Sequence, residues 1–210
     1  MAVNVTDLNE PKVKFCMNWA NRLTISRFFL TLVFVVAMSW DWKYGHTVAL
    51  IIFVIASITD YADGEIARRF SLITDFGKLM DPLMDKILIT SAFICLIPFH
   101  AIPAWAVVVV ISREFAITGL RLLALSKGRM LAAESLGKHK TFWQITTVIF
   151  FLLLLTISEL QGYEVVGIMP PWFQAIWNDA GSVLIAVTVL LTLFSGIGYL
   201  WKNKGIIEME

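Results

Sequence analysis

Charged residues are scarce in this sequence, and that scarcity narrows the class of protein. Only 16% of the 210 residues are Asp, Glu, Lys or Arg, whereas 58% are hydrophobic, and the mean hydropathy is +0.76. This balance excludes an ordinary soluble domain and predicts a polytopic membrane protein. The net charge is only +1, and we expect membrane lipid rather than nucleic acid among its partners.

Cysteine and histidine are also rare. Cys16 and Cys95 fall near opposite membrane faces in the topology predicted below, so a disulfide between them is not feasible, and neither has a partner at metal-ligand spacing. The three histidines have no such spacing either. The sequence therefore gives no sign of a thiolate or imidazole metal site, and we assign both cysteines to packing.

Residues 1–20 lack the uninterrupted apolar run and the small-residue cleavage site of a signal peptide. They mix charges with apolar side chains such as Leu8, Val13 and Trp19. We interpret this segment as an amphipathic helix lying in the cytoplasmic interface, with a disordered tail as the alternative.

Six apolar runs are long enough to cross a bilayer. They cover residues 23–40, 47–70, 78–99, 103–126, 141–158 and 180–201. We predict an all-α polytopic membrane protein with the interfacial segment over residues 1–20, a six-helix membrane domain over 21–204 and a tail over 205–210. Pro170, Pro171, Trp172 and Trp177 suggest an outer loop pressed on the membrane surface before the last span.

Lysine and arginine are nearly missing from one side of this topology. They gather at the two termini and in the connections between spans two and three and between spans four and five, whereas the opposite connections contain only Lys43. The positive-inside rule then places both termini in the cytoplasm. We expect the inner membrane of a bacterium, with the functional site facing the cytoplasm.

Four regularly spaced aspartates interrupt the second and third apolar runs. They occur in the pattern Asp60-x-x-Asp63-Gly64-x-x-Ala67-Arg68 and then Gly77-x-x-x-Asp81-x-x-x-Asp85. Carboxylates within a bilayer are costly, so four together imply a function. If the two spans form an antiparallel hairpin that turns near residue 72, Asp60 lies level with Asp85 and Asp63 lies level with Asp81.

Four facing carboxylates raise one another's pKa unless cations bind between them. Oxygen ligands select Mg²⁺, Mn²⁺ or Ca²⁺ over zinc, and four carboxylates neutralise two divalent ions. Such a metal pair suits displacement at phosphorus. One alternative is an ion-pair network with Arg68, Lys78 and Lys86, which does not explain four regularly placed acids.

The small residues of the pattern favour a ligand groove. Gly64, Ala67 and Gly77 leave the helix surface open for a flat group, although small residues in membrane helices more often serve packing. A cation transporter that uses the same carboxylates is an alternative, but it does not explain Gly64, Arg68 and Gly77. Membrane prenyltransferases also use aspartates and magnesium, but their two aspartate motifs lie far apart in the chain.

Four cations form a second candidate set, at Arg113, Arg121, Lys138 and Lys140. Arg113 lies deep in the fourth predicted span, where a cation is costly unless it faces a cavity or an acid, and guanidinium groups suit phosphate. A buried pair of Arg113 with Glu114 or an aspartate is the alternative, and ordinary loop charge is the alternative for the two lysines. Together the four favour a phosphorylated acceptor.

The aspartate pattern resembles the signature of the CDP-alcohol phosphotransferases at every position. The resemblance implies a six-helix membrane enzyme, usually a homodimer, that transfers a phosphatidyl or related group from a CDP-linked donor to an alcohol and releases CMP. It implies that the four aspartates bind two ions, here Mg²⁺ or Mn²⁺, and that Asp85 is the base. It also implies a donor site, formed by Asn21, Gly64, Ala67, Arg68 and Gly77.

A narrower resemblance covers most of residues 18–145. The segments 112–121, Leu136-Gly137-Lys138-x-Lys140-Thr141 and Asn21-x-Leu23-Thr24-x-x-Arg27 are similar to the phosphatidylglycerophosphate synthase branch, although Ala20 stands where that branch often has proline. The branch implies CDP-diacylglycerol and sn-glycerol 3-phosphate as substrates and phosphatidylglycerophosphate and CMP as products. Inositol phosphate, serine or phosphatidylglycerol as acceptor stays open.

Overall fold

The computed structural model describes residues 19–40, 42–70, 86–126, 135–162 and 170–203. Within these ranges, the surroundings of side chains are described for residues 26–40, 42–59, 86–124, 139–162 and 170–203. The predicted interfacial segment over residues 1–20 and the tail over 205–210 therefore lie almost wholly outside the described residues.

All regular structure in the described ranges is helical, as the composition predicts. The helices are α1 (Trp19–Ser39), α2 (Gly45–Phe70), a short helix over Lys86–Cys95, α4 (Ala104–Ser126), α5 (Ser135–Gln161), α6 (Pro171–Ala175), the π-helical turn η1 (Ile176–Ala180) and α7 (Gly181–Lys202). The long helices pack in pairs, α1 on α2, α2 on α5, α5 on α7 and α4 on α7.

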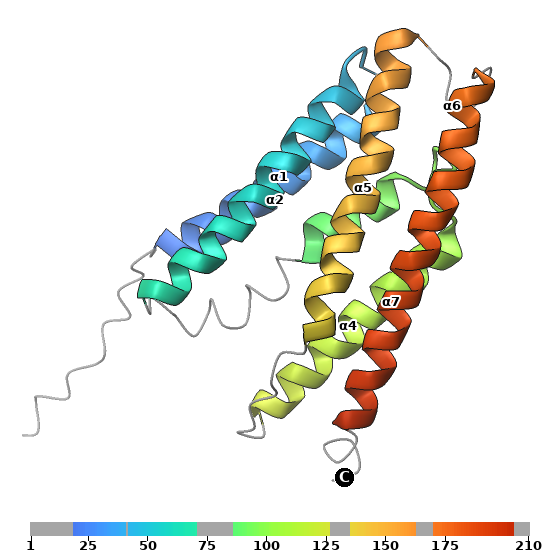
Figure 1. Ribbon diagram of the computed structural model, residues 1–210. Helices are drawn as coiled ribbons and strands as arrows, with labels where there is room; N and C mark the ends of the chain where they lie inside the picture. The colour runs from blue at the N-terminus through green and yellow to red at the C-terminus, as the bar shows by residue number, and fades with distance from the viewer. Residues whose placement is uncertain (1–18, 41, 71–85, 127–134, 163–169, 204–210) are drawn as a thin grey trace, which may run out of the picture.

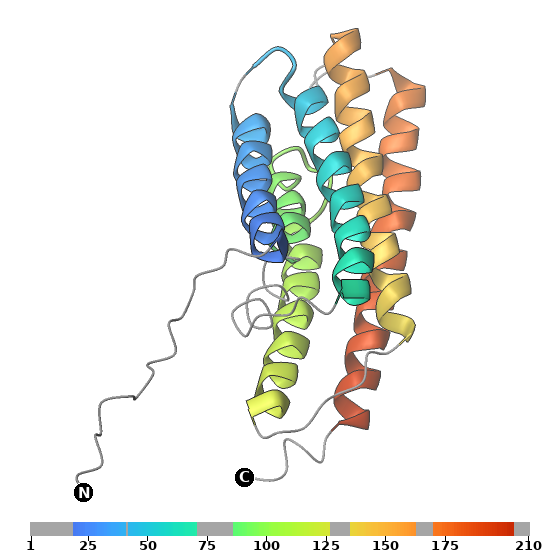
Figure 2. The same ribbon diagram turned by 90° about the vertical axis from the view of Figure 1, so that its left-hand side faces the viewer.

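The long helices form an elongated bundle (Figures 1 and 2). Helix α1 begins, α2 ends, α4 ends, α5 begins and α7 ends toward the same end of this bundle, drawn at the bottom of both views. We call it the α5-start end, and the other end, where α5 finishes and α6 begins, the α5-finish end. The first described helix therefore begins, and the last one ends, toward the same end of the bundle.

Two helices over the described residues are long and apolar enough to cross a membrane, His139–Gln161 and Pro171–Lys202. Three shorter apolar helices cover Ser26–Ser39, Gly45–Thr59 and Lys86–Cys95. Large apolar side chains such as Phe29, Phe142 and Phe194 are exposed on the outside of the bundle, where lipid would cover them. The all-helical membrane architecture is supported, while the count of six spans stays a prediction.

The core lies between the long helices and is built from aromatic and branched side chains. Phe34 of α1 and Phe53 of α2 are fully buried and their ring centroids are 5.9 Å apart. Cys95 is free and packs against this core, which confirms its assignment to packing, while Cys16 lies outside the described residues.

The segment before the last predicted span is helical, so its interpretation as an outer surface loop was wrong. Pro171 stands at the start of α6, where a missing N–H costs nothing, and the chain continues through η1 into α7. Phe173 and Trp177 are buried, and the ring of Trp177 lies 5.3 Å from that of Phe151. Trp177 packs on α5 at the start of this helix, whereas Trp172 is 57% exposed.

A carboxylate from α5 holds the beginning of α2 at the α5-finish end. Glu159 accepts hydrogen bonds from the backbone N–H groups of His46 (2.9 Å) and Thr47 (3.0 Å) and from the Thr47 hydroxyl (2.6 Å). These are the first N–H groups of a helix, which have no partner within the helix itself. Glu159 therefore caps α2 from a position 113 residues away in the chain.

Candidate active site

The first half of the aspartate pattern lies in the last turns of α2. Asp60, Asp63, Gly64, Ala67 and Arg68 all fall within Gly45–Phe70, so the predicted helical spacing is observed, and residues three apart share a helix face. Their side chains are not among those described. Gly77, Asp81 and Asp85 lie outside the described residues, so the two facing tiers of carboxylates stay a prediction.

A cavity of about 220 Å³ lies within the bundle, next to the part of α2 that precedes Asp60. Its lining comes from α1, α2, the Lys86–Cys95 helix, α4 and α5. The lining residues are Arg27, Ser57, Lys86, Leu88, Ile89, Thr90, Val110, Glu114, Thr141, Gln144 and Ile145. Ser57 lies one turn before Asp60 in α2, and Lys86 directly follows Asp85. The lining therefore includes residues close in the chain to Asp60 and to Asp85.

The same cavity also meets the other two predicted motifs. Arg27 ends the motif that begins at Asn21, whose own side chain is not described, while Glu114 and Thr141 are the chain neighbours of Arg113 and Lys140. Five helical segments thus contribute to one hollow in the bundle, each with a residue in or near a predicted motif. The lining of this hollow includes cationic, anionic and hydroxyl side chains, which is unusual within an apolar bundle.

Gln144 supplies an amide donor to the cavity wall. It is 2% exposed, and its Nε2 makes no hydrogen bond to any residue that the structure describes. A buried amide without a partner is costly, so such groups are often reserved for a ligand or water. The sequence analysis did not identify Gln144, because a single glutamine in an apolar helix carries no motif.

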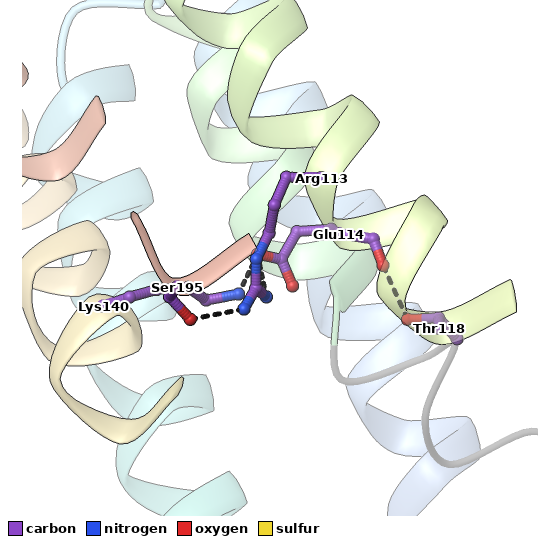
Figure 3. Close-up of polar contacts among 5 residues, drawn as sticks. All are labelled: Arg113, Glu114, Thr118, Lys140 and Ser195. Atoms are coloured by element: carbon purple, nitrogen blue, oxygen red, sulfur yellow. Dashed lines mark hydrogen bonds and ion pairs between the residues drawn. The ribbon is translucent and has the colours of Figure 1, made fainter. Parts of the chain in front are cut away.

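Two of the four predicted cations meet at Glu114 (Figure 3). Arg113 Nη1 lies 3.4 Å from Glu114 Oε1, and Lys140 Nζ of α5 donates to the same oxygen. Arg113 Nη2 also donates to the Ser195 hydroxyl of α7 at 2.6 Å. Arg113 and Lys140 therefore share one carboxylate in a nearly dry place.

Arg121 makes a separate contact with α7. Its Nε donates to the Tyr199 hydroxyl at 3.1 Å, and its guanidinium carbon lies 5.3 Å from the centre of the Tyr199 ring. Arg113 and Arg121 therefore do not share one partner, although both face α7. Neither arginine, nor Lys140, is among the described residues that line the cavity itself.

The predicted acceptor set is thus brought together in part. Arg113 and Lys140 meet through Glu114, Arg121 lies further along α4, and Lys138 falls in the first turn of α5 with its side chain not described. The alternative for Arg113, a pair with Glu114, is also observed, so the two interpretations are not exclusive. The sequence analysis missed the contribution of α7, whose polar positions were read only as part of a span.

The four aspartates are suitable ligands for hard divalent ions, because they offer oxygen atoms alone. Among the side chains that the structure describes, no three His, Cys, Asp or Glu residues come together. The four aspartates are not part of that set, so the metal site stays a prediction. Asp60 and Asp63 are placed for it by helical spacing on α2.

Comparisons with known proteins point in the same direction as this geometry. The family model described as CDP-alcohol phosphatidyltransferase matches residues 17–194. A Bacillus subtilis protein named CDP-diacylglycerol--glycerol-3-phosphate 3-phosphatidyltransferase is 39% identical over 198 residues, covering 89% of this chain and 95% of its own. A Rickettsia felis protein of the same name is 32% identical over 183 residues, covering 87% and 93%.

A third relative, from Mycobacterium tuberculosis, is named "Probable phosphatidylglycerophosphate synthase" and is 34% identical over 185 residues, covering 87% of this chain and 79% of its own. The matches run through α1, the aspartate pattern, the cation cluster and most of α7. Because the family model covers far more than half of the sequence, this chain belongs to the CDP-alcohol phosphatidyltransferase family.

Proposed function

We propose that this protein is the enzyme that transfers the phosphatidyl group of CDP-diacylglycerol to sn-glycerol 3-phosphate, giving phosphatidylglycerophosphate and CMP. The observation that carries the proposal is the polar cavity, whose lining includes residues in or near the predicted motifs, next to two basic side chains that share one carboxylate. The printed names of the relatives support the same donor and acceptor.

The four aspartates, Asp60, Asp63, Asp81 and Asp85, would hold two divalent ions, Mg²⁺ or Mn²⁺. Bound there, the ions would offset the negative charge of the donor pyrophosphate and of the departing CMP. We assign Asn21, Gly64, Ala67, Arg68 and Gly77 to the donor, following the family signature. The small residues leave room for the nucleotide, and Arg68 supplies a cation for its phosphates.

Asp85 would accept the proton of the acceptor hydroxyl. The hydroxyl oxygen then forms a bond to the phosphorus that carries the diacylglycerol, and the bond from that phosphorus to the CMP oxygen breaks. A direct displacement needs no enzyme nucleophile. Lys86, the next residue in the chain, lines the cavity.

Arg113, Arg121, Lys138 and Lys140 would bind the phosphate of the acceptor. Two basic side chains, Arg113 and Lys140, meet at Glu114, and such a pair suits the phosphate of an acceptor better than a neutral alcohol. Gln144 can donate to a ligand oxygen in the adjacent cavity. The arrangement favours a phosphorylated acceptor over serine.

The location follows from the same reasoning. We propose that the protein is an integral protein of the bacterial inner membrane, with the α5-start end and both termini in the cytoplasm, and that it forms a homodimer. Soluble glycerol 3-phosphate would enter from the cytoplasm, and the lipid donor would enter from the bilayer. Positive charge on this side of the predicted topology supports the orientation.

CMP release by the purified protein tests the proposal. CDP-diacylglycerol with Mg²⁺ or Mn²⁺ is supplied together with glycerol 3-phosphate, inositol phosphate, serine or phosphatidylglycerol in separate reactions. We expect release that depends on glycerol 3-phosphate. Release with another acceptor only would keep the family chemistry and overturn the assigned acceptor, while ion flux without any CMP release would favour a transporter.

A further inference from the structure

Helix α7 contacts both of the arginines that α4 directs toward the acceptor site, and no other described helix does so from outside α4. Ser195 accepts from Arg113 Nη2 at 2.6 Å, and Tyr199 accepts from Arg121 Nε at 3.1 Å. The two α7 residues are four positions apart, so they lie on one face of the helix. Both are also buried, at 2% exposed each.

We propose that Ser195, Gly196 and Tyr199 are positioning residues, which aim Arg113 and Arg121 at the phosphate of the acceptor and thereby set acceptor affinity. The inference rests on the proposed function, because it assigns a role to groups around the same site. It adds contacts from α7 to that site, and α7 carries none of the family signature residues.

The contact with Tyr199 leaves the two terminal nitrogens of the Arg121 guanidinium available for a ligand. Tyr199 holds the Nε edge and offers its ring to the charge, and Nη1 and Nη2 make no hydrogen bond to any residue in the described ranges. A guanidinium anchored in this way presents its terminal donors in a fixed direction, which is the geometry that binds phosphate oxygens in pairs.

The Tyr199 ring itself has a separate, structural role. It is buried in a small apolar cluster with Ile117, Leu120 and Ala124 of α4. The ring joins the two helices, and the hydroxyl is the part that reaches Arg121. Replacing Tyr199 with phenylalanine therefore removes the contact to the arginine and keeps the packing.

Gly196 gives Arg113 the space to lie against α7. A Cβ at position 196 would be 2.8 Å from Cγ of Arg113, close to the backbone end of that side chain, so the arginine would have to move. Gly198, two residues further, has nothing within 4 Å of an added Cβ. The two glycines therefore form a matched pair of test positions on one helix.

The test compares Michaelis constants for the two substrates. For Tyr199→Phe we expect the KM for glycerol 3-phosphate to rise about fivefold, the size of one hydrogen bond, with little change in the KM for CDP-diacylglycerol. Gly196→Ala should raise the same constant by at least as much, while Gly198→Ala should leave both constants unchanged. Equal rises for both substrates, or no rise, would overturn the proposal.

A double-mutant cycle separates positioning from general damage. If Tyr199 acts through Arg121, Tyr199→Phe should have no further effect on the KM for the acceptor once Arg121→Ala is present. The same fivefold rise in both backgrounds would overturn the proposal. If the wild-type protein uses a different alcohol phosphate, the proposed function fails, and the same cycle run with that acceptor still decides whether α7 aims the arginines.

Discussion

Two carboxylates at different depths of the bundle are used in different ways. Glu159, at the α5-finish end, accepts three hydrogen bonds from the beginning of α2, so its carboxylate is hydrogen-bonded within the fold. Glu114 holds two cations and lines a cavity. One carboxylate closes a helix end, while the other joins two basic side chains beside a cavity.

This difference distinguishes a carboxylate that stabilises the fold from one that belongs to the proposed binding site. A polar group that is satisfied by its own fold contributes stability and has no capacity left for a ligand. A cluster of buried basic and acidic side chains beside a cavity costs stability and is kept where binding requires it. The comparison predicts that a substitution at Glu159 lowers stability, while a substitution in the cation cluster around Glu114 changes acceptor binding.

The largest effect should come from the aspartates beside the cavity. Asp85→Asn keeps the size of the side chain and removes the base, and we expect turnover to fall by about 10²–10⁴-fold. CMP release measures the loss, and thermal unfolding in detergent should stay close to that of the wild type. A variant that keeps full activity would remove Asp85 from the mechanism.

A smaller effect is expected at the cation cluster. Arg113→Ala removes one of the two cations at Glu114 and its contact to Ser195, so the KM for glycerol 3-phosphate should rise about tenfold, consistent with a lost charged hydrogen bond. The KM for CDP-diacylglycerol should change much less. Equal changes in both constants would indicate damage to the fold.

The smallest effect on catalysis should come from the α5-finish end. Glu159→Ala leaves the first N–H groups of α2 without their acceptor, and we expect a loss of about 1–3 kcal/mol in the free energy of unfolding. The unfolding temperature should fall while both Michaelis constants stay at wild-type values. A selective rise in the acceptor KM would contradict the assignment of Glu159 to stability and of the Glu114 cluster to binding.

The motifs at the site could be predicted because their chemistry fixes residue type and spacing together. Asp60 and Asp63 need a common helix face to share ions, and that spacing is visible in the sequence and in α2. Arg113 was recognisable because a cation deep in an apolar run requires a partner or a ligand. Both signals are local in the chain.

The contributions of α7 and α5 could not be predicted in the same way. Ser195 and Tyr199 meet their arginines across 82 and 78 residues, and serine and tyrosine are common in membrane helices. Gln144 has no motif around it. The helix start at Pro171 was missed for a different reason, because two prolines suggest a loop although proline is well suited to the first turn of a helix.

The π-helical turn η1 sets the rotational phase of the last helix. Trp177, within this turn, packs against Phe151 of α5, while Ser195 and Tyr199, further along the chain, contact arginines of α4. Each residue added to or removed from a continuous helix turns everything beyond it by about 100°. A single deletion within Ile176–Ala180 would therefore turn the face of α7 that carries Ser195 and Tyr199 away from both arginines. The contacts of α7 with Arg113 and Arg121 thus depend on a π-helical turn that lies far from the cavity.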